Sequence, residues 1–318
     1  MNWQRYHRLG TIYQFMQDLA KQFPHLVEVF SIGKSFEGRD LLVAKIGKKQ
    51  NYEKPAIFIE GGIHAREWIS PATVTFILRQ LVLNYDLNQD IVNFYDVYIL
   101  PVMNPDGYEF THTKDRLWRK NRSKAPISLG NLFPGCVGVD LNRNFGFHWA
   151  EPSIKHIRGG SSLPCVETYQ GESPFSESES RAVSDFVFSK RHLIVIYLSY
   201  HSYGEKIVYP WSYTAQPVYD VDDLHPMAIE MSNAIFDESL GKKRFEVGSS
   251  PFVQYSASGG SDDWVKGSAG VKWVFLLELP DKGKYGFLLP AKQIVPTARA
   301  GLAALRAVSS KVSYTLVR

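Results

Sequence analysis

Short apolar runs of strand length alternate with amphipathic stretches of helical length along the whole chain. Several runs lack polar interruptions, which is typical of strands covered on both faces. The predicted strands are Leu26–Phe30, Leu41–Ile46, Ala56–Glu60, Asp96–Leu100, Leu193–Tyr200, Ile207–Tyr209 and Val271–Leu279. The predicted helices are Thr11–Phe23, Pro71–Leu83, Ser176–Lys190, Pro226–Leu240 and Thr297–Ser309. This alternation, without a linker rich in Pro, Gly or Ser, predicts one α/β domain over residues 1–318.

Two predicted helix starts carry capping signals. Ser70 stands before Pro71, an N-cap residue followed by proline at the first helical position. Ser176 and Glu179 have the spacing of a capping box. Between these helices, residues 104–173 are rich in Gly and Pro and poor in periodicity. So long an irregular segment in a compact domain usually builds a site.

Composition excludes several classes of protein. Hydrophobic residues make up 44% and aromatic residues 14% of the 318 positions, so the chain can bury a large core and is not disordered. No window reaches the roughly 18 apolar residues that a transmembrane helix needs. The net charge of +4 is scattered without a basic run, which gives little support to nucleic-acid or membrane binding.

The two cysteines, Cys136 and Cys165, lie in the irregular segment. Their spacing fits a disulfide better than a metal site, with a pair of reduced structural thiols as the alternative. A disulfide would imply an exported protein, yet the first ten residues hold no apolar stretch of the kind a signal peptide needs. Either the signal has been removed or the protein is cytosolic.

Candidate metal ligands follow two predicted strands. His64 and Glu67 come just after Ala56–Glu60, at the strand end where open α/β sheets place ligands. Alone, this pair is more typical of a surface ion pair. A second strand, however, ends directly in His201. Two histidines and a glutamate form the ligand set of catalytic zinc sites, which leave a coordination position open.

A buried carboxylate and three arginines add to this pattern. Glu278 lies in the apolar strand Val271–Leu279, where it must either pair with a cation or act as a general base. Arg66, Arg122 and Arg143 stand in the segments around the predicted site, although each alone would be typical of a surface residue. Guanidinium groups bind carboxylates in a bidentate manner, so together they indicate a substrate with a free carboxylate.

Seven motifs identify a family. They occur in this order: GGIHAREWISPA, PVMNPDGY, LWRKNRS, GVDLNRNF, YLSYHSYGE, YSASGGSDDW and LELPDKGKYGFLLP. With them the chain resembles the zinc metallocarboxypeptidases of the pancreatic A/B type, from Tyr6 to about Leu305. The resemblance implies a mixed, mostly parallel, twisted sheet of about eight strands with helices on both faces. It also implies a zinc-dependent exopeptidase that hydrolyses the C-terminal peptide bond, with one Zn²⁺ per chain.

The resemblance assigns roles to the residues that match these motifs. The zinc ligands are His64, Glu67 and His201. Glu278 is the general base for the zinc-bound water, and Arg122 polarises the scissile carbonyl. The terminal carboxylate is held by Asn142, Arg143 and Tyr255. Subsites further along the peptide are lined by Arg66, Ser202, Tyr203 and Phe287.

The specificity pocket resembles that of the B type. Asp262, in SGGSDDW, occupies the position that is apolar in the A type and aspartate in the B type, and Ser212 matches the B-type companion. A desolvated carboxylate favours Lys or Arg, because a neutral guest would leave it unpaired. In the alternative, Asp262 binds local backbone and Asp263 or a displaced loop sets the specificity. A-type or broad specificity, and a non-catalytic binder of peptide C-termini, are the competing functions.

The family also sets expectations about processing and partners. The chain is expected to be a secreted, extracellular, zymogen-derived digestive enzyme, present as the mature domain without signal peptide or pro-segment. The expected partners are peptide C-termini, protein inhibitors of carboxypeptidases and a cleaved pro-segment, but no nucleic acid and no membrane, and the expected state is a monomer. Asn121 begins a glycosylation sequon that we expect to be unused.

Overall fold

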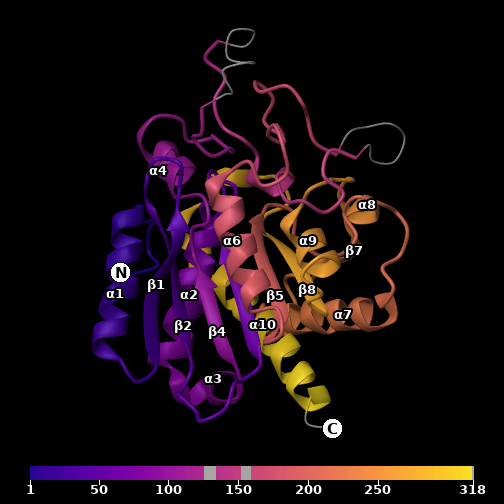
Figure 1. Cartoon of the computed structure of the whole chain (residues 1–318). Helices are drawn as coiled ribbons and strands as arrows, with labels where there is room; N and C mark the ends of the chain where they lie inside the picture. The colour runs from indigo at the N-terminus through magenta and orange to yellow at the C-terminus, as the bar shows by residue number, and fades with distance from the viewer. Residues whose placement is uncertain (125–133, 152–158, 317–318) are drawn as a thin grey trace.

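One mixed sheet organises the computed structural model, which describes residues 1–124, 134–151 and 159–316 (Figure 1). Its strands are β1 (Val27–Lys34), β2 (Asp40–Ile46), β3 (Ala56–Gly61), β4 (Asp96–Leu100), β5 (Ile194–Ser202), β6 (Lys206–Tyr209), β7 (Glu246–Ser249) and β8 (Trp273–Leu279). The strand order is β1-β2-β4-β3-β5-β8-β6-β7. The central strands β4, β3, β5 and β8 are parallel, whereas β2 pairs with β4, and β6 with β8, in the antiparallel sense. The predicted α/β class with a mixed sheet is confirmed.

Helices cover both faces of the sheet (Figure 1). They are α1 (Leu9–Gln22), α2 (Ile69–Leu83), α3 (Gln89–Phe94), α4 (Pro105–Thr113), α6 (Ser178–Ser189), α7 (Val221–Glu238), α8 (Ser250–Val253), α9 (Ser261–Gly267) and α10 (Ile294–Leu316). One core layer joins α1, α2, α7 and α10 to the sheet, and the other joins α6 and α9 to it. Along β3, Ile57 and Ile59 enter the first layer and Phe58 enters the second, because neighbouring side chains of a strand point to opposite faces. This explains the unbroken apolar runs.

Several local predictions need correction. The short strand β7 was not predicted, and α4 lies within the segment that we expected to be irregular. The helix α2 begins at Ile69, so Ser70 is not its N-cap; its hydroxyl accepts from Gly62 N at 3.0 Å and donates to the carbonyl of Tyr200. The helix α6 begins at Ser178 without a side-chain cap. At both starts the expected capping hydroxyl binds a different partner. Among the described residues, no helix is long and apolar enough to cross a membrane.

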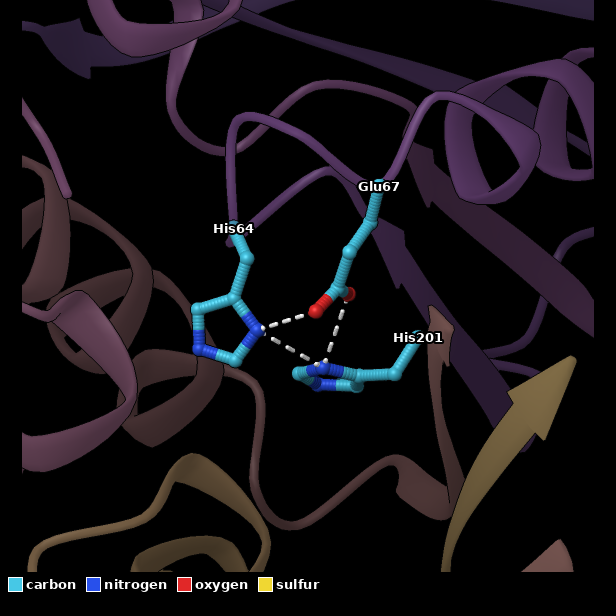
Figure 2. A group of neighbouring side chains, drawn as sticks. All are labelled: His64, Glu67 and His201. Atoms are coloured by element: carbon cyan, nitrogen blue, oxygen red, sulfur yellow. Dashed lines mark hydrogen bonds and ion pairs between the residues drawn. The ribbon is translucent and has the colours of Figure 1, made fainter. Parts of the chain in front are cut away.

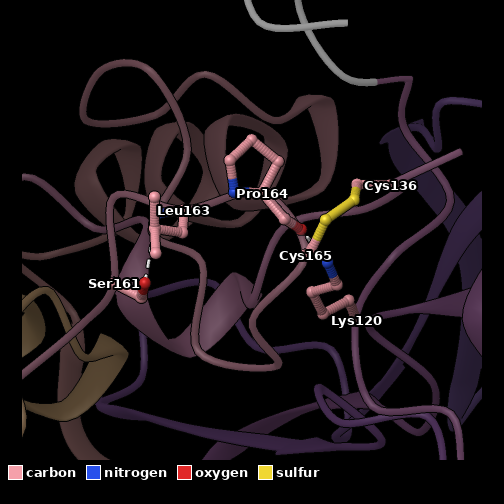
Figure 3. Close-up of a disulfide and its surroundings, with 6 residues drawn as sticks. All are labelled: Lys120, Cys136, Ser161, Leu163, Pro164 and Cys165. Carbon is pink, nitrogen blue, oxygen red and sulfur yellow. Dashed lines mark hydrogen bonds between the residues drawn. A yellow bond between two sulfur atoms is a disulfide. The ribbon is translucent and has the colours of Figure 1, made fainter. Parts of the chain in front are cut away.

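A disulfide closes the loop segment that lies beyond one end of the sheet (Figures 1 and 3). Cys136 and Cys165 are bonded, with their Cα atoms 4.8 Å apart, which confirms the predicted pairing. Beside the bond, Lys120 Nζ donates to the carbonyl of Pro164 at 2.6 Å. The two contacts join chain on both sides of residues 140–143, which contribute to the candidate site described below.

A buried polar network around Asn121 also holds the loop segment that the disulfide closes. Asn121 is fully buried, and its Nδ2 donates to Glu177 Oε2 at 2.6 Å and to Glu179 Oε2 at 3.2 Å. Its Oδ1 accepts from Val139 N at 2.8 Å. The nitrogen that a glycan would need is therefore enclosed in the folded chain, which supports our expectation that the sequon is unused.

This network predicts a pH-dependent stability. Burial raises the pKa of Glu179 from 4.5 to about 7, and the neighbouring Glu177 adds to the shift. Between these pH values the folded state keeps a proton that the unfolded state has lost, so the free energy of unfolding falls as the pH rises. We expect Glu179→Gln to remove up to about 3 kcal/mol of this fall. Urea unfolding of the wild type and of Glu179→Gln between about pH 4 and about pH 8 measures this difference. Free energies of unfolding that fall in parallel with pH in the two proteins would contradict the prediction.

Candidate metal centre and cleft

Three side chains converge at the carboxyl ends of the central strands (Figure 2). His64 and Glu67 lie on the turn between β3 and α2, and His201 lies near the end of β5, the parallel neighbour of β3. His64 Nδ1 lies 2.8 Å from Glu67 Oε1 and 3.2 Å from His201 Nδ1. His201 Nδ1 lies 3.2 Å from Glu67 Oε2. Among the described residues, these three form the one group of His, Cys, Asp and Glu side chains that could hold a metal ion.

The geometry of this group fits zinc. Ligand atoms about 2.0–2.1 Å from a tetrahedral zinc are separated by about 3.3 Å, close to the spacings seen here. All three side chains are buried. Burial opposes ionisation of Glu67, but the imidazoles of His64 and His201 outweigh this effect and hold its pKa below the usual range. Two imidazole nitrogens facing an ionised carboxylate form an open His₂Glu set, which catalytic zinc sites use.

Asp140 organises the residues around this group. Its Oδ1 lies 3.2 Å from His64 Nε2 and accepts from Asn142 N at 3.0 Å. Its Oδ2 accepts from Arg119 Nε at 2.9 Å. A carboxylate on the outer nitrogen of a histidine fixes the ring and leaves the other nitrogen free to bind metal. Our sequence reasoning missed Asp140, although it stands two positions before Asn142 in the GVDLNRNF motif.

Arg122 does not reach the centre, contrary to our expectation. Its guanidinium lies over the rings of Phe110 and Trp118, at 3.7 and 4.6 Å from their centroids. Arg119 lies at the centre instead: it is buried against Asp140. Its charge also acts on Glu67, Tyr255 and Glu278. Both arginines stand in the LWRKNRS motif, three positions apart, and it is Arg119 that the structure places against Asp140.

Glu278 lies next to the metal-binding group. It is on β8, in parallel register with His201 on β5, and is 6% exposed. Its Oε1 accepts from Gln254 Nε2 at 2.8 Å, whereas no described residue makes a hydrogen bond to its Oε2. Burial raises the pKa of Glu278 to about 7, although the imidazole of His201 opposes the shift. A carboxyl group with such a pKa can both take and release a proton near neutral pH.

A hollow beside the metal-binding group is lined by His64, His201 and Glu278. Three residues that the sequence assigned to the substrate carboxylate also line it. Asn142 and Arg143 are in the 3₁₀ turn Leu141–Arg143 and are buried. Asn142 Oδ1 accepts from Ser261 N at 2.9 Å, which ties this turn to the start of α9. Tyr255 is half exposed, with its ring centroid 5.8 Å from the guanidinium carbon of Arg143. The side chain of Tyr255 is thus the exposed member beside two fixed polar groups.

Two neighbouring aspartates have different partners at the end of this hollow. Asp263 accepts from the backbone nitrogens of Ser212 and Tyr213 at 2.8 and 3.0 Å. Asp262 lines the hollow, is 2% exposed, and accepts from Ser212 Oγ at 2.9 Å. It is therefore Asp263 that binds the backbone of residues 212 and 213, and Asp262 that lines the hollow.

Three of the remaining predicted site residues pack against one another. Tyr203 and Phe287 pack edge to face at 4.9 Å, and the guanidinium of Arg66 lies over the ring of Phe287 at 4.2 Å. Arg66 also donates to Glu167 at 2.8 Å. Ser202 lies deeper, where its backbone nitrogen donates to the ligand Glu67 at 3.1 Å.

Comparisons with known proteins agree with this geometry. The family described as zinc carboxypeptidase matches residues 12–304. Carboxypeptidase B of Astacus astacus is 42% identical over 99% of both chains. The chain belongs to the zinc carboxypeptidase family. It is thus a metallocarboxypeptidase, a hydrolase, and its metal is zinc; among the described residues, His64, Glu67 and His201 are the group that could hold the ion.

Other relatives of this zinc carboxypeptidase differ in type. Mouse carboxypeptidase A4 is 39% identical over 98% of this chain and 71% of its own length. Bovine thrombin-activatable fibrinolysis inhibitor, solved in complex with tick carboxypeptidase inhibitor, superposes with a TM-score of 0.89 at 40% identity, covering 98% of this chain and 99% of that one. Because relatives of both the A and the B type match at nearly equal identity, overall similarity does not decide the substrate.

Proposed function

We propose that this zinc carboxypeptidase removes C-terminal Lys and Arg residues. The observation that carries the proposal is Asp262: it is buried at the hollow, and among the described residues no Lys, Arg or His lies within ion-pair distance of it. A buried carboxylate without a cation is costly, so a basic guest side chain stabilises it and an apolar one does not. Ser212 supports the carboxylate from one side.

Substrate positioning follows from the polar groups around the hollow. Asn142 and Arg143 are buried; Asp140 and Ser261 hold Asn142, and Arg143 N donates to the carbonyl of Asp140, so they offer fixed donors for a terminal carboxylate. A peptide anchored there presents the bond one residue away to the metal centre, whereas an internal segment lacks the anchoring group. Tyr255 is exposed enough to cover the bound end.

The chemical step needs a base and an electrophile. Bound zinc would supply Lewis acidity and lower the pKa of water. Glu278 is placed to accept the proton of the attacking water and to return it to the leaving amine, because its Oε2 lacks a protein partner among the described residues. We assign to Arg119, in place of Arg122, the stabilisation of negative charge on the carbonyl oxygen.

The two arginines make a matched test of that assignment. We expect Arg119→Met to lower kcat about 10²-fold to 10³-fold, the typical cost of losing a donor to a developing oxyanion. Arg122→Met should leave kcat close to that of the wild type, because its guanidinium lies on Phe110 and Trp118. Steady-state kinetics of both variants, with zinc content checked, measure the difference. A larger loss in Arg122→Met would return the role to Arg122, and equal losses would contradict its assignment to Arg119 alone.

A substrate series tests the proposed specificity directly. We expect kcat/KM on matched blocked dipeptides to be highest for those ending in Arg or Lys and at least about 10²-fold lower for those ending in Phe or Leu. All four activities should disappear on treatment with a zinc chelator and return with added Zn²⁺. Preference for Phe would favour A-type specificity, and tight binding without turnover would favour a peptide-binding function.

Cellular context is part of the same proposal. We propose that the protein is secreted, because a disulfide such as Cys136–Cys165 persists in oxidising compartments. We also propose that residues 1–318 act as one monomeric catalytic domain. The likeness to a structure solved with a tick carboxypeptidase inhibitor supports regulation by protein inhibitors, and a cleaved pro-segment is a further proposed partner.

A further inference from the structure

Gln254 connects two parts of the site that the proposed mechanism treats separately. It stands between α8 and Tyr255, and its Nε2 donates to Glu278 Oε1 at 2.8 Å. The same side chain lines the hollow together with Asp262 and Ser212. One amide therefore contacts the base and lines the same hollow as the residues proposed to select the C-terminal side chain.

The chemistry of the partner fixes the orientation of this amide. An ionised carboxylate only accepts hydrogen bonds, so the nitrogen of Gln254 must face Glu278 and the oxygen must lie on the other side. The one side-chain hydrogen bond of Gln254 among the described residues is made by its nitrogen, so no described residue donates to that oxygen. Lys and Arg side chains carry only donors, so an unpaired acceptor on the hollow that Asp262 also lines matches a basic guest and offers nothing to an apolar one.

The backbone around Gln254 is anchored on both sides. Gln254 N donates to Ser250 O at 2.8 Å, and Ser250 Oγ donates to Tyr255 O at 2.6 Å. Lys206 Nζ donates to the carbonyl of Val253. Because these contacts hold the main chain, the half-exposed side chain of Tyr255 can change its rotamer while Gln254 keeps its place at Glu278.

We propose that Gln254 is a positioning residue that couples recognition of a basic C-terminal side chain to the orientation of Glu278. Its amide nitrogen holds one oxygen of the base, which directs the other oxygen to the water. Its amide oxygen accepts a hydrogen bond from the ammonium or guanidinium group in the hollow. The inference rests on the proposed function, since it takes Glu278 as the base and Lys or Arg as the preferred guest.

Two substitutions at this position separate the two ends of the amide. Gln254→Met keeps the size of the side chain but removes donor and acceptor. We expect kcat to fall about tenfold on substrates ending in Arg and in Phe, and KM to rise about fivefold for Arg only. Gln254→Glu keeps the acceptor but places a carboxylate against Glu278, so kcat should fall further while KM for Arg stays near the wild-type value.

Controls distinguish this role from simple packing. Gln216→Met makes the same change at an exposed position and should leave all constants unchanged. Equal kcat and KM in Gln254→Met and the wild type would overturn the inference, as would a KM that rises equally for Arg and Phe. If Gln254→Met fails to fold, Gln254→Glu alone decides, because a wild-type kcat there excludes contact with the base.

The same assays distinguish failure of the proposed function from failure of the coupling role of Gln254. If wild-type protein prefers Phe, or if Glu278→Gln keeps full activity, the proposed function fails and the coupling fails with it. If Glu278→Gln and Asp262→Asn behave as expected but both Gln254 variants match the wild type, only the coupling is overturned.

Discussion

Replacing Glu278 with Gln is expected to lower kcat about 10³-fold to 10⁴-fold while zinc content and folding stay unchanged. The substitution keeps the size of the side chain and its place on β8 beside His201. It removes the group that can accept a proton, since an amide oxygen is far too weak a base at neutral pH. The loss should fall on kcat rather than KM, because Glu278 acts on the water and not on the anchored carboxylate.

A blocked dipeptide ending in Arg is the appropriate substrate for this measurement. Glu246→Gln is a matched control, because Glu246 is exposed on β7 and should tolerate the change. Zinc content and circular dichroism show whether either variant has lost the metal or the fold. Wild-type turnover in Glu278→Gln would mean that another group takes the proton, and the proposed mechanism would be wrong.

The sequence predicted the metal centre well because its ligands lie at the ends of strands. Buried parallel strands leave a strong apolar signal, and their carboxyl ends must meet at one edge of the sheet. His64 and Glu67 after one strand and His201 after another were therefore expected to be neighbours, and the structure brings their ligand atoms within 4.8 Å of one another. The alternation of apolar runs was enough to define the fold class for the same reason.

Residues on the irregular segment were harder to place. Without a strand or helix period, nothing in the sequence tells which of two arginines three positions apart faces the centre, and Arg122 was chosen where the structure places Arg119. Asp140 was missed because its role depends on partners from two other segments, His64 and Arg119. Such contacts exist only after the loops have packed, so they leave no local pattern.

The two aspartates at the hollow show what a motif alone leaves open. SGGSDDW contains two adjacent carboxylates, either of which could face the substrate or bind the loop. The structure separates them, since Asp263 accepts from the backbone of residues 212 and 213 and Asp262 lines the hollow. Substitutions at the two positions should consequently differ: loss of Asp263 should destabilise the loop, whereas loss of Asp262 should change selectivity.

Asp262→Asn is thus expected to reverse the substrate preference. An amide keeps the shape of the hollow and can still accept from Ser212, but it carries no charge to offset that of a buried Lys or Arg. Breaking a buried ion pair by removing one partner typically costs several kcal/mol, so kcat/KM for substrates ending in Arg should fall about 10³-fold. For substrates ending in Phe it should rise by up to about tenfold, because no carboxylate is left unpaired when an apolar side chain enters.

The ratio of kcat/KM between Arg and Phe measures this reversal without depending on the amount of active enzyme. Asp90→Asn is the control: Asp90 is exposed and far from Asp262 in sequence, so this change should leave the ratio unchanged. A fall in both activities by the same factor would mean that Asp262 maintains the loop rather than selecting the substrate. An unchanged ratio would show that the charge which selects Lys and Arg lies elsewhere, and the assignment of B-type specificity would fail while the metal centre and the base remained as described.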